Sequence, residues 1–469
     1  MKTRRWLPIV FVVGLVIIIG AVYQQLIPRV VAFSPENKTT GVFVDAPIRL
    51  EFSREMDTDS VAENLTIDPP LSGDLGWDGN TALFIPDDPW EHGATIEIRL
   101  GEEARSSMGL KLGEELVWSF TVGRTLLAYL FPADGPSDVY ALDIVSGEIQ
   151  RFTTTLGVLD FDVDSAGMKI YYSAVNQEGG SNLFMYDRAS GESELLLDCG
   201  VELCSSVQIH PNQSILAYSR LGSSLGDGNI ESQVWLISDL AVGETEALIP
   251  RGETRSPQWS FGGWLSYYHV DLQRFMFLNQ ETGERVSFAN ETGEVGTWLP
   301  DGEIYITTKL IASQLDTLRG PSGEAQNAEV DVGALETVGT VSSHLISFNL
   351  QNGRVTDLTR DSLLEDTAPA FSPNGRLVAL ARKYIDERRW IPGRQLWLMS
   401  VDGSEAFQLT DDLDFKHTAF AWHPNGQTIA FIRFNQILLT DPPELWVIDV
   451  DGRNAIQLII GGYAPQWIP

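Results

Sequence analysis

Hydrophobic and polar residues alternate in short runs along most of this chain of 469 residues. Runs at 48–52, 82–85, 95–100 and 116–122 are separated by turns rich in Pro, Gly, Asp and Asn. A period of two residues is typical of strands that bury one face. The sequence also contains 13 Trp, 12 Tyr, 21 Phe and 42 Gly, and aromatic residues favour strands whereas Gly favours tight turns. The pattern predicts an all-β protein.

One strand pattern recurs from residue 124 to the C-terminus. Each copy ends in a polar residue and leads to a tight turn, and successive turns are 40 to 70 residues apart; the turn glycines are Gly147, Gly191, Gly243, Gly283, Gly353, Gly403 and Gly452. An aromatic-x-Pro-Asn/Asp-Gly segment precedes the copies, most clearly at 298–302, 371–375 and 422–426. Each unit therefore has about four strands, which is the content of one propeller blade.

The repeat resembles the propeller repeats of TolB-like proteins over residues 125–469. The first unit, which begins at Thr125, lacks the innermost strand, and residues 464–469 have the pattern of that strand. We therefore expect the C-terminal strand to close the ring in the first blade, because closure leaves no exposed sheet edge. The seven turn glycines predict seven blades. Six blades, the number in TolB itself, is the alternative.

Residues 31–123 predict a separate β-sandwich domain. Their landmarks are Ser34-Pro35, then Phe52-Ser53-Arg54-Glu55-Met56-Asp57, and finally a run at 118–122. In this order they resemble the bacterial Ig-like domain of surface-layer and other exported proteins. The resemblance implies a spacer or an adhesive module. Asp57 and Asp59 are candidate calcium ligands, with polar turn residues as the simpler interpretation.

The N-terminus predicts insertion into a membrane. Lys2, Arg4 and Arg5 precede residues 6–27, which carry no charge. About twenty apolar residues suffice to cross the hydrocarbon core, and the basic flank stays in the cytoplasm. We expect residues 1–30 to form a cytoplasmic tip and an uncleaved transmembrane helix, with the Ig-like domain (31–123) and the propeller (124–469) outside. A cleaved signal peptide is the alternative.

The net charge of -32 restricts the choice of partners. A field of this sign repels phosphate backbones and anionic lipid headgroups, which argues against nucleic acid as a partner. The chain has two cysteines, Cys199 and Cys204. Outside the cytoplasm this pair predicts a disulfide. Two free thiols, or a metal site that includes His210, are the alternatives.

Loop lengths distinguish one face of the predicted propeller. If the strands of a blade are named a to d from the channel outwards, the a–b and c–d turns are short, whereas the b–c loops at 220–232, 309–343, 382–394 and 433–443 vary. The b–c and d–a loops share one face, and variable loops on a rigid scaffold commonly carry function. The segment 309–343 is expected to be a lid or partly disordered.

One of these b–c loops concentrates cations and aromatic residues in an otherwise acidic chain. The candidate binding residues are Lys383, Tyr384, Arg388, Arg389, Trp390 and Arg394. Arg and Trp are common in binding hot spots, and such a set suits a peptide or a sugar. The alternative is a solvated loop that packs Trp390 on its own blade.

The sequence offers little catalytic chemistry. It contains no H-E-x-x-H or P-loop motif, and no α/β-hydrolase domain follows the propeller. His210 and His423 share one repeat position, which favours packing over ligation. Asp160, Asp162 and Asp164 alternate along one predicted strand and are candidate calcium ligands.

We expect an extracytoplasmic scaffold, anchored in the cell membrane and without a cofactor. Its loop face would bind an envelope protein, a peptide or a glycan. An envelope lyase or hydrolase that uses the central channel is the alternative.

Overall fold

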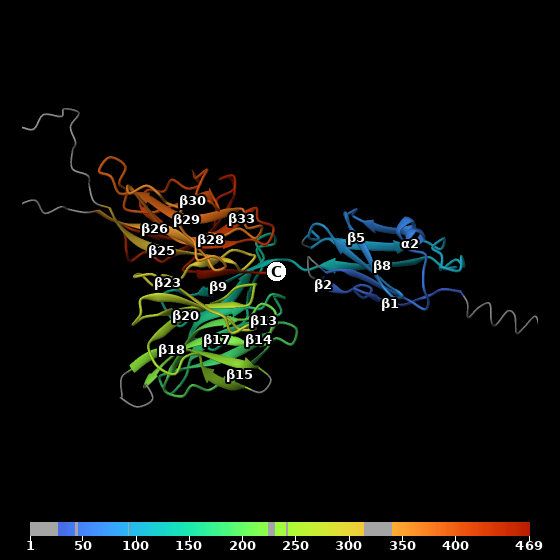
Figure 1. Ribbon diagram of the computed structural model, residues 1–469, viewed down its shortest axis with the longest axis horizontal. Coiled ribbons are helices and arrows are strands. Elements are labelled where there is room, and N and C mark those ends of the chain that lie inside the picture. Colours follow the sequence, from blue (N-terminus) through green and yellow to red (C-terminus); the bar gives the residue numbers. More distant parts are fainter. Residues whose placement is uncertain (1–26, 43–45, 92, 224–229, 241–242, 314–339) are drawn as a thin grey trace, which may run out of the picture. The chain divides into compact units, whose positions relative to one another are not determined.

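The computed structural model describes residues 27–469 except 43–45, 92, 224–229, 241–242 and 314–339 (Figure 1). The chain divides into two compact units, one ending at Thr125 and the other spanning Leu126–Ile468. Strands make up nearly all the regular structure of both described units. The protein is therefore all-β, as the alternating pattern predicts.

The described part of the chain contains no helix that is long and apolar enough to cross a membrane. A span needs about 20 residues, whereas the helix α2 (Thr58–Asn64) has seven. The expected fold class is therefore wrong in its N-terminal transmembrane helix. Residues 6–26, on which that expectation rested, lie outside the described residues.

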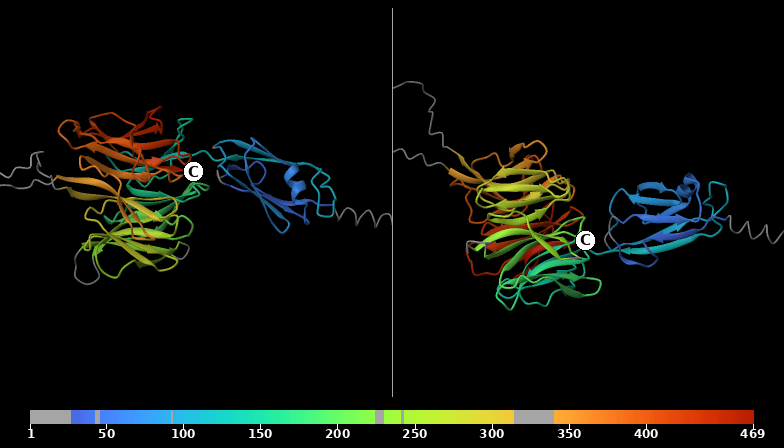
Figure 2. Two further views of the ribbon diagram at one scale, coloured as in Figure 1. Left: turned by 45° about the horizontal axis from the view of Figure 1, so that its top comes forward. Right: turned by 60° about the horizontal axis from the view of Figure 1, so that its bottom comes forward.

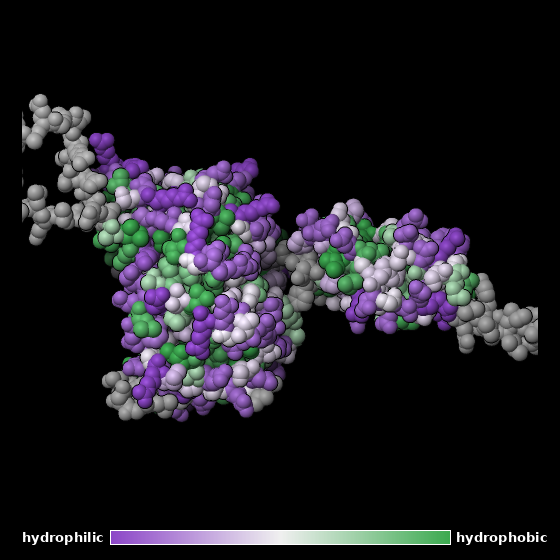
Figure 3. All heavy atoms as spheres, viewed as in Figure 1, coloured by the Kyte–Doolittle hydropathy of each residue, from purple (hydrophilic) through white to green (hydrophobic). Residues whose placement is uncertain are grey.

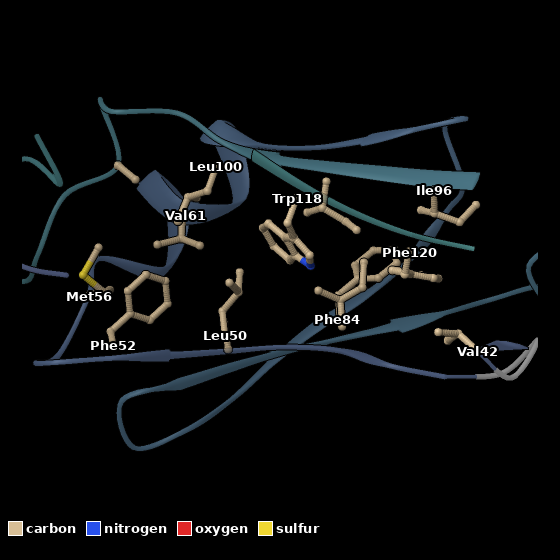
Figure 4. Packing of buried hydrophobic residues seen from close by; sticks show 14 of the residues in the cluster. Val42, Leu50, Phe52, Met56, Val61, Phe84, Ile96, Leu100, Trp118 and Phe120 are labelled. Carbon is tan, nitrogen blue, oxygen red and sulfur yellow. The ribbon is translucent and has the colours of Figure 1, made fainter. Parts of the chain in front are cut away.

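The first unit is a sandwich of two four-stranded sheets with the orders β1-β3-β6-β5 and β2-β8-β7-β4. The strands are β1 (Val30–Ser34), β2 (Thr40–Val42), β3 (Ile48–Phe52), β4 (Leu65–Asp68), β5 (Gly73–Asp78), β6 (Thr81–Pro86), β7 (Thr95–Leu100) and β8 (Leu116–Val122). β3 and β7 bury every second residue. Figure 4 shows these side chains meeting around Trp118, with Phe52 and Phe84 entering from the facing sheet.

The second unit contains seven four-stranded sheets, the blades of a propeller, within the described residues. Blade 1 comprises β36 (Tyr463–Ile468), β9 (Leu126–Phe131), β10 (Asp138–Leu142) and β11 (Ile149–Arg151); blade 2, β12 (Val158–Val163), β13 (Lys169–Val175), β14 (Ser181–Asp187) and β15 (Glu192–Leu197); blade 3, β16 (Leu203–Ile209), β17 (Leu216–Ser223), β18 (Ile230–Asp239) and β19 (Glu244–Ala247); blade 4, β20 (Thr254–Trp259), β21 (Trp264–His269), β22 (Arg274–Asn279) and β23 (Arg285–Ala289). Blade 5 comprises β24 (Thr297–Trp298), β25 (Ile304–Ser313), β26 (Thr340–Asn349) and β27 (Val355–Asp357); blade 6, β28 (Leu364–Phe371), β29 (Leu377–Tyr384), β30 (Gln395–Ser400) and β31 (Phe407–Gln408); blade 7, β32 (Phe415–Trp422), β33 (Thr428–Asn435), β34 (Glu444–Asp449) and β35 (Ile456–Ile460). The segment expected as a loop at 309–343 begins and ends inside β25 and β26, and its residues 314–339 lie outside the described part.

The C-terminal strand closes the ring. β36 pairs antiparallel with β9, from Tyr463 opposite Leu130 to Ile468 opposite Leu126, and Figure 2 shows the red end of the chain within the ring of blades. The Trp467 indole N–H donates to the Ala421 carbonyl in blade 7 at 2.9 Å. The Gln466 side chain donates to Asp162 in blade 2 at 2.8 Å. Its place in blade 1 is as the sequence predicts, and its side chains also join blade 1 to blades 2 and 7.

A β-bulge recurs in the innermost strands and was not predicted from the sequence. The register shifts at one position in β16, β20, β28, β32 and β36. The shift coincides with a non-glycine residue at positive φ: Ser206, Ser256, Ala368, Ala419 and Ala464. Such a backbone is unfavourable for an L-residue, so the neighbouring strands must hold it in place.

Removal of residues 463–469 should strip blade 1 of its innermost strand and expose the edge of β9. We expect aggregation, or a fall in melting temperature of well over 5 °C, because each kcal/mol lost lowers the melting temperature of a large domain by roughly 2–4 °C. Thermal unfolding monitored by circular dichroism provides the measurement. Removal of Pro469 alone is the control and should have little effect, and an unchanged melting temperature for the longer deletion would contradict closure by β36.

Asp162 should make closure sensitive to pH. Burial raises the pKa of this carboxyl group from 3.8 to about 6, against hydrogen bonds from Gln466 and from two backbone amides. A raised pKa in the folded state stabilises the protein at low pH, and this contribution is lost as the pH rises from about 4 through about 6. The wild type should therefore lose stability as the pH rises through this range, whereas Asp162→Asn should not. Urea unfolding at several pH values measures the difference in the free energy of unfolding, which should shift in favour of the variant as the pH rises. A difference that is constant with pH would show that Asp162 does not titrate in this way.

Candidate binding face

Exposed apolar side chains gather on the face of the propeller that carries the b–c and d–a loops. Among the described residues, those at or beside these loops are Leu156, Val175, Val201, Leu203, Leu221, Ile230, Leu272, Val295, Leu310, Val341, Leu363, Trp390, Leu413, Phe434, Ile437, Leu438, Leu439 and Ile460. At or beside the a–b and c–d turns the described residues of this kind are fewer: Val145, Ile149, Met168, Phe261, Val355, Phe407 and Ile456. Exposed apolar surface concentrated on one face is typical of an interaction site.

Part of this apolar surface lies on neighbouring loops of blades 6 and 7. We call it the blade 6/7 patch and define it by Trp390, Leu413, Ile437, Leu438 and Leu439, all at least half exposed. The loop that carries Leu413 lies between the b–c loops of both blades. The Gly393 amide donates to the Leu413 carbonyl at 3.0 Å, and the Gln436 amide donates to the Asp414 carbonyl at 2.7 Å. The backbone therefore holds the three loops side by side.

The six residues predicted from the b–c loop of blade 6 separate into two groups. Lys383 and Arg394 turn inwards, where both bind the Glu365 carboxylate of β28, at 3.4 and 2.8 Å. The Glu365 carboxylate thus pairs with two of the cations that the sequence analysis proposed for a ligand.

The other four side chains lie towards the tip of the loop. Arg389 binds Asp386 at 2.7 Å and lies 3.8 Å from the centroid of the Tyr384 ring. Arg388 and Trp390 are exposed, Trp390 by 56%. The Trp390 ring centroid also lies 5.8 Å from Lys383 Nζ of β29, so the indole keeps one contact with its own blade, in line with the alternative interpretation. Trp390 and Arg388 are thus the members of the set best placed to meet a partner.

Cys199 and Cys204 form a disulfide between β15 and β16. Both residues are buried, and the Cys204 amide donates to the Ser181 hydroxyl at 2.8 Å. The bridge closes a d–a loop and therefore lies on the same face as the blade 6/7 patch. It stabilises the fold of that loop and contributes no exposed thiol.

Four of the five carboxylates considered for calcium, all but the exposed Asp59, accept hydrogen bonds from the protein. Asp160 accepts hydrogen bonds from the Ser206 and Val207 amides at 2.7 and 3.0 Å and from the Ser173 hydroxyl at 2.9 Å. Asp164 accepts from two amides of its own turn, and Asp57 caps α2 through Ser60. No group of three or more potential metal ligands exists in the part of the chain that the structure describes.

The histidines of the repeat have a structural role. His210 and His423 each accept from the backbone amide two residues later, at 3.0 and 3.1 Å. Each ring also meets a Trp of the next blade edge-on, Trp259 and Trp467, with centroids 4.6 and 4.5 Å apart. Equivalent contacts at equivalent positions agree with packing rather than ligation.

Blade 5 contains a Ser–His–Asp arrangement that the sequence analysis missed. Ser342 Oγ is 2.9 Å from His344 Nε2, and His344 Nδ1 is 2.8 Å from Asp357 Oδ2. These are the contacts of a nucleophile, a base and an orienting acid. However, Ser342 has 0% exposure, and a nucleophile must be reached by its substrate. The only signal in the sequence is the spacing of Ser342 and His344 on one face of a strand.

The equivalent residues of other blades favour a structural interpretation of this arrangement. Asp138 in blade 1 and Gln395 in blade 6 occupy the position of His344, and each accepts a hydrogen bond from a Thr on the neighbouring chain segment, at 2.7 and 3.1 Å.

A Gly-x-Ser-x-Gly spacing also occurs, at 222–226, but its Ser224 lies outside the described residues.

The first unit matches a known family. Residues 25–122 match the family model described as a bacterial Ig-like domain. This result confirms the resemblance inferred from the Phe-Ser-x-x-Met-Asp segment. No protein with a curated description is significantly similar to the chain in sequence.

Solved structures similar to the chain are β-propeller proteins. TolB from Acinetobacter baumannii is 12% identical, with 87% of this chain and 83% of that chain covered and a TM-score of 0.42. A putative TolB from Agrobacterium tumefaciens is 17% identical, with 73% and 91% covered and a TM-score of 0.38. A puromycin-hydrolysing peptidase from Mycobacterium tuberculosis is 13% identical, with 72% and 52% covered and a TM-score of 0.48. The strand pairing defines the propeller independently of these similarities.

Proposed function

We propose that this protein is a non-catalytic scaffold outside the cytoplasm, whose b–c/d–a face binds an envelope protein or peptide through the blade 6/7 patch. The observation that carries the proposal is the concentration of exposed apolar side chains on this face. Leu439 is 79% exposed and follows two other exposed apolar residues, Ile437 and Leu438. Leaving such groups in water is costly unless a partner covers them.

The surroundings of the patch favour a protein partner over a glycan. Aliphatic side chains bury apolar surface, whereas sugars are bound mainly by aromatic stacking with polar groups. In the patch, Trp390 is the aromatic residue and the other four members are aliphatic. An exposed aromatic residue, with the exposed Arg388 two residues before it in sequence, also matches the composition of protein hot spots.

The compartment is part of the proposal. A disulfide persists in oxidising surroundings outside the cytoplasm, and Cys199 and Cys204 are joined in the structure. The net charge of -32 keeps such a protein soluble.

Substitutions in the patch should remove binding without affecting the fold. We expect Trp390→Ser combined with Leu438→Ser and Leu439→Ser to weaken capture of envelope components by the full chain, since loss of two or three hot-spot side chains costs about 2–4 kcal/mol, or roughly thirty- to a thousandfold in affinity. Binding of the captured partner is then measured by biolayer interferometry, and circular dichroism checks the fold.

The matched control is Val145→Ser with Phe261→Ser, which removes exposed apolar groups from the opposite face. These variants should bind normally. If they lose binding while the patch variants keep it, the wrong face has been assigned.

The absence of serine hydrolase activity can be tested directly. Because Ser342 is buried, we expect no labelling by a fluorophosphonate probe that reacts with activated serines. Mass spectrometry of the treated full chain provides the measurement. Labelling that disappears in Ser342→Ala but persists in Ser343→Ala would show that blade 5 opens to expose a working nucleophile, and would contradict the scaffold proposal in favour of a hydrolase.

A further inference from the structure

The Ig-like unit contains a groove that the proposed function does not use. It has a volume of about 410 Å³ and lies between β4 and β5; its lining is Ala62, Leu65, Thr66, Ile67, Pro70, Leu71, Gly73, Leu75 and Phe84. Seven of these nine residues are Leu, Ile, Phe, Ala or Pro, and none of the nine is charged. Figure 3 shows hydrophobic surface where Figure 1 labels β5, with hydrophilic residues around it.

Both strands that flank the groove are edge strands. β5 ends the order β1-β3-β6-β5, and β4 ends the order β2-β8-β7-β4. An edge strand presents unpaired N–H and C=O groups that can accept a further strand. β5 has six residues and no Pro, whereas β4 runs directly into Pro69 and Pro70, which cannot donate. The open edge of β5 is therefore the better template.

The side chains of β5 alternate in the way that an added strand requires. Leu75 and Trp77 are partly buried, whereas Asp74, Gly76 and Asp78 are exposed. A strand paired with β5 would place every second side chain over the groove, against Leu75 and the Leu65 and Ile67 side chains of β4. The backbone hydrogen bonds would supply affinity, and the groove would select the apolar side chains.

The acidic residues around β5 determine the charge of the strand that can pair with it. Residues 55–98 include 11 acidic residues, Asp68, Asp74 and Asp78 among them, and no Lys or Arg. A second copy of β5 added antiparallel about Gly76 would place Asp74 opposite Asp78, and like charges directly opposite one another destabilise a sheet. A partner with basic residues at those positions would gain from the same geometry.

We propose that the β5 edge and the groove beside it bind an extended segment of another protein, in which apolar residues alternate with Lys or Arg. The segment adds a fifth strand to the sheet β1-β3-β6-β5. Its apolar side chains enter the groove, and its cations face Asp74 and Asp78. This site is independent of the blade 6/7 patch.

The probe is a seven-residue peptide that alternates Lys and Val, with blocked ends and a fluorescent label, titrated with the full chain and followed by fluorescence anisotropy. We expect saturable binding, and at least tenfold weaker binding of the same peptide with Glu in place of Lys. Ala62→Arg should weaken binding at least tenfold, because it places a bulky cation at an exposed position on the wall of the groove. Thr66→Lys, also exposed, is a second variant in case the first disturbs α2.

The matched control is Val31→Arg, which adds a cation at an exposed position on β1, the opposite edge of the same sheet. This variant should bind the peptide as the wild type does. The proposal is overturned if the Lys peptide does not bind at 1 mM, if the Glu peptide binds equally well, or if Val31→Arg weakens binding as much as Ala62→Arg and Thr66→Lys do. Loss of binding in the blade 6/7 patch variants would also overturn it, because the two sites are separate.

Discussion

The structure of the second unit depends on one non-local contact, the pairing of β36 with β9. More than 300 residues separate the two strands, so their association costs chain entropy that no local interaction repays. What compensates is the burial of Trp467 and Ile468 together with hydrogen bonds from the closing strand to blades 2 and 7. Once the ring is closed, each blade packs on two neighbours, and loops from different blades keep fixed positions. The blade 6/7 patch lies on two blades that are consecutive in sequence, and closure fixes the outer neighbour of blade 7.

The innermost strands show how the ring accommodates a strained backbone. The bulge at Ser206 directs two successive amides towards blade 2, where both oxygens of Asp160 receive them. Burial nevertheless raises the pKa of Asp160, since a carboxylate in a dry environment favours its neutral form. Asp162 binds the Ile209 amide in the same way, at 2.8 Å. These carboxylates therefore join neighbouring blades, and their oxygens are engaged by amides rather than left open for a cation.

Local patterns predicted much of the fold and little of the site. The c–d turns and the aromatic-x-Pro-Asn-Gly segments are determined by a few consecutive residues. Their positions in the sequence therefore predicted the strands of each blade and the closing strand. The bulges and the partners of buried cations depend on residues distant in sequence. Arg382, for example, binds Asp366 through two hydrogen bonds of 2.7 Å and lies 5.2 Å from the Trp397 ring centroid. The spacing of these residues in the sequence does not predict either contact. Glu365 likewise comes from another strand, so its pairing with Lys383 and Arg394 could not be predicted from local spacing. The run at 6–27 predicted a transmembrane helix from its hydropathy alone, whereas the described part of the chain contains no helix that could span a membrane.

The two candidate surfaces differ in the physical property that selects a partner. In the blade 6/7 patch, aliphatic side chains supply affinity through burial, and apolar burial alone discriminates weakly between partners of similar shape. At the β5 edge the backbone supplies the affinity, and the acidic surroundings reject strands of the wrong charge. Because the whole chain carries -32, its field slows acidic partners and accelerates basic ones at both surfaces. The net charge thus affects how fast a partner reaches either surface, and the local chemistry of each surface determines whether the partner stays bound.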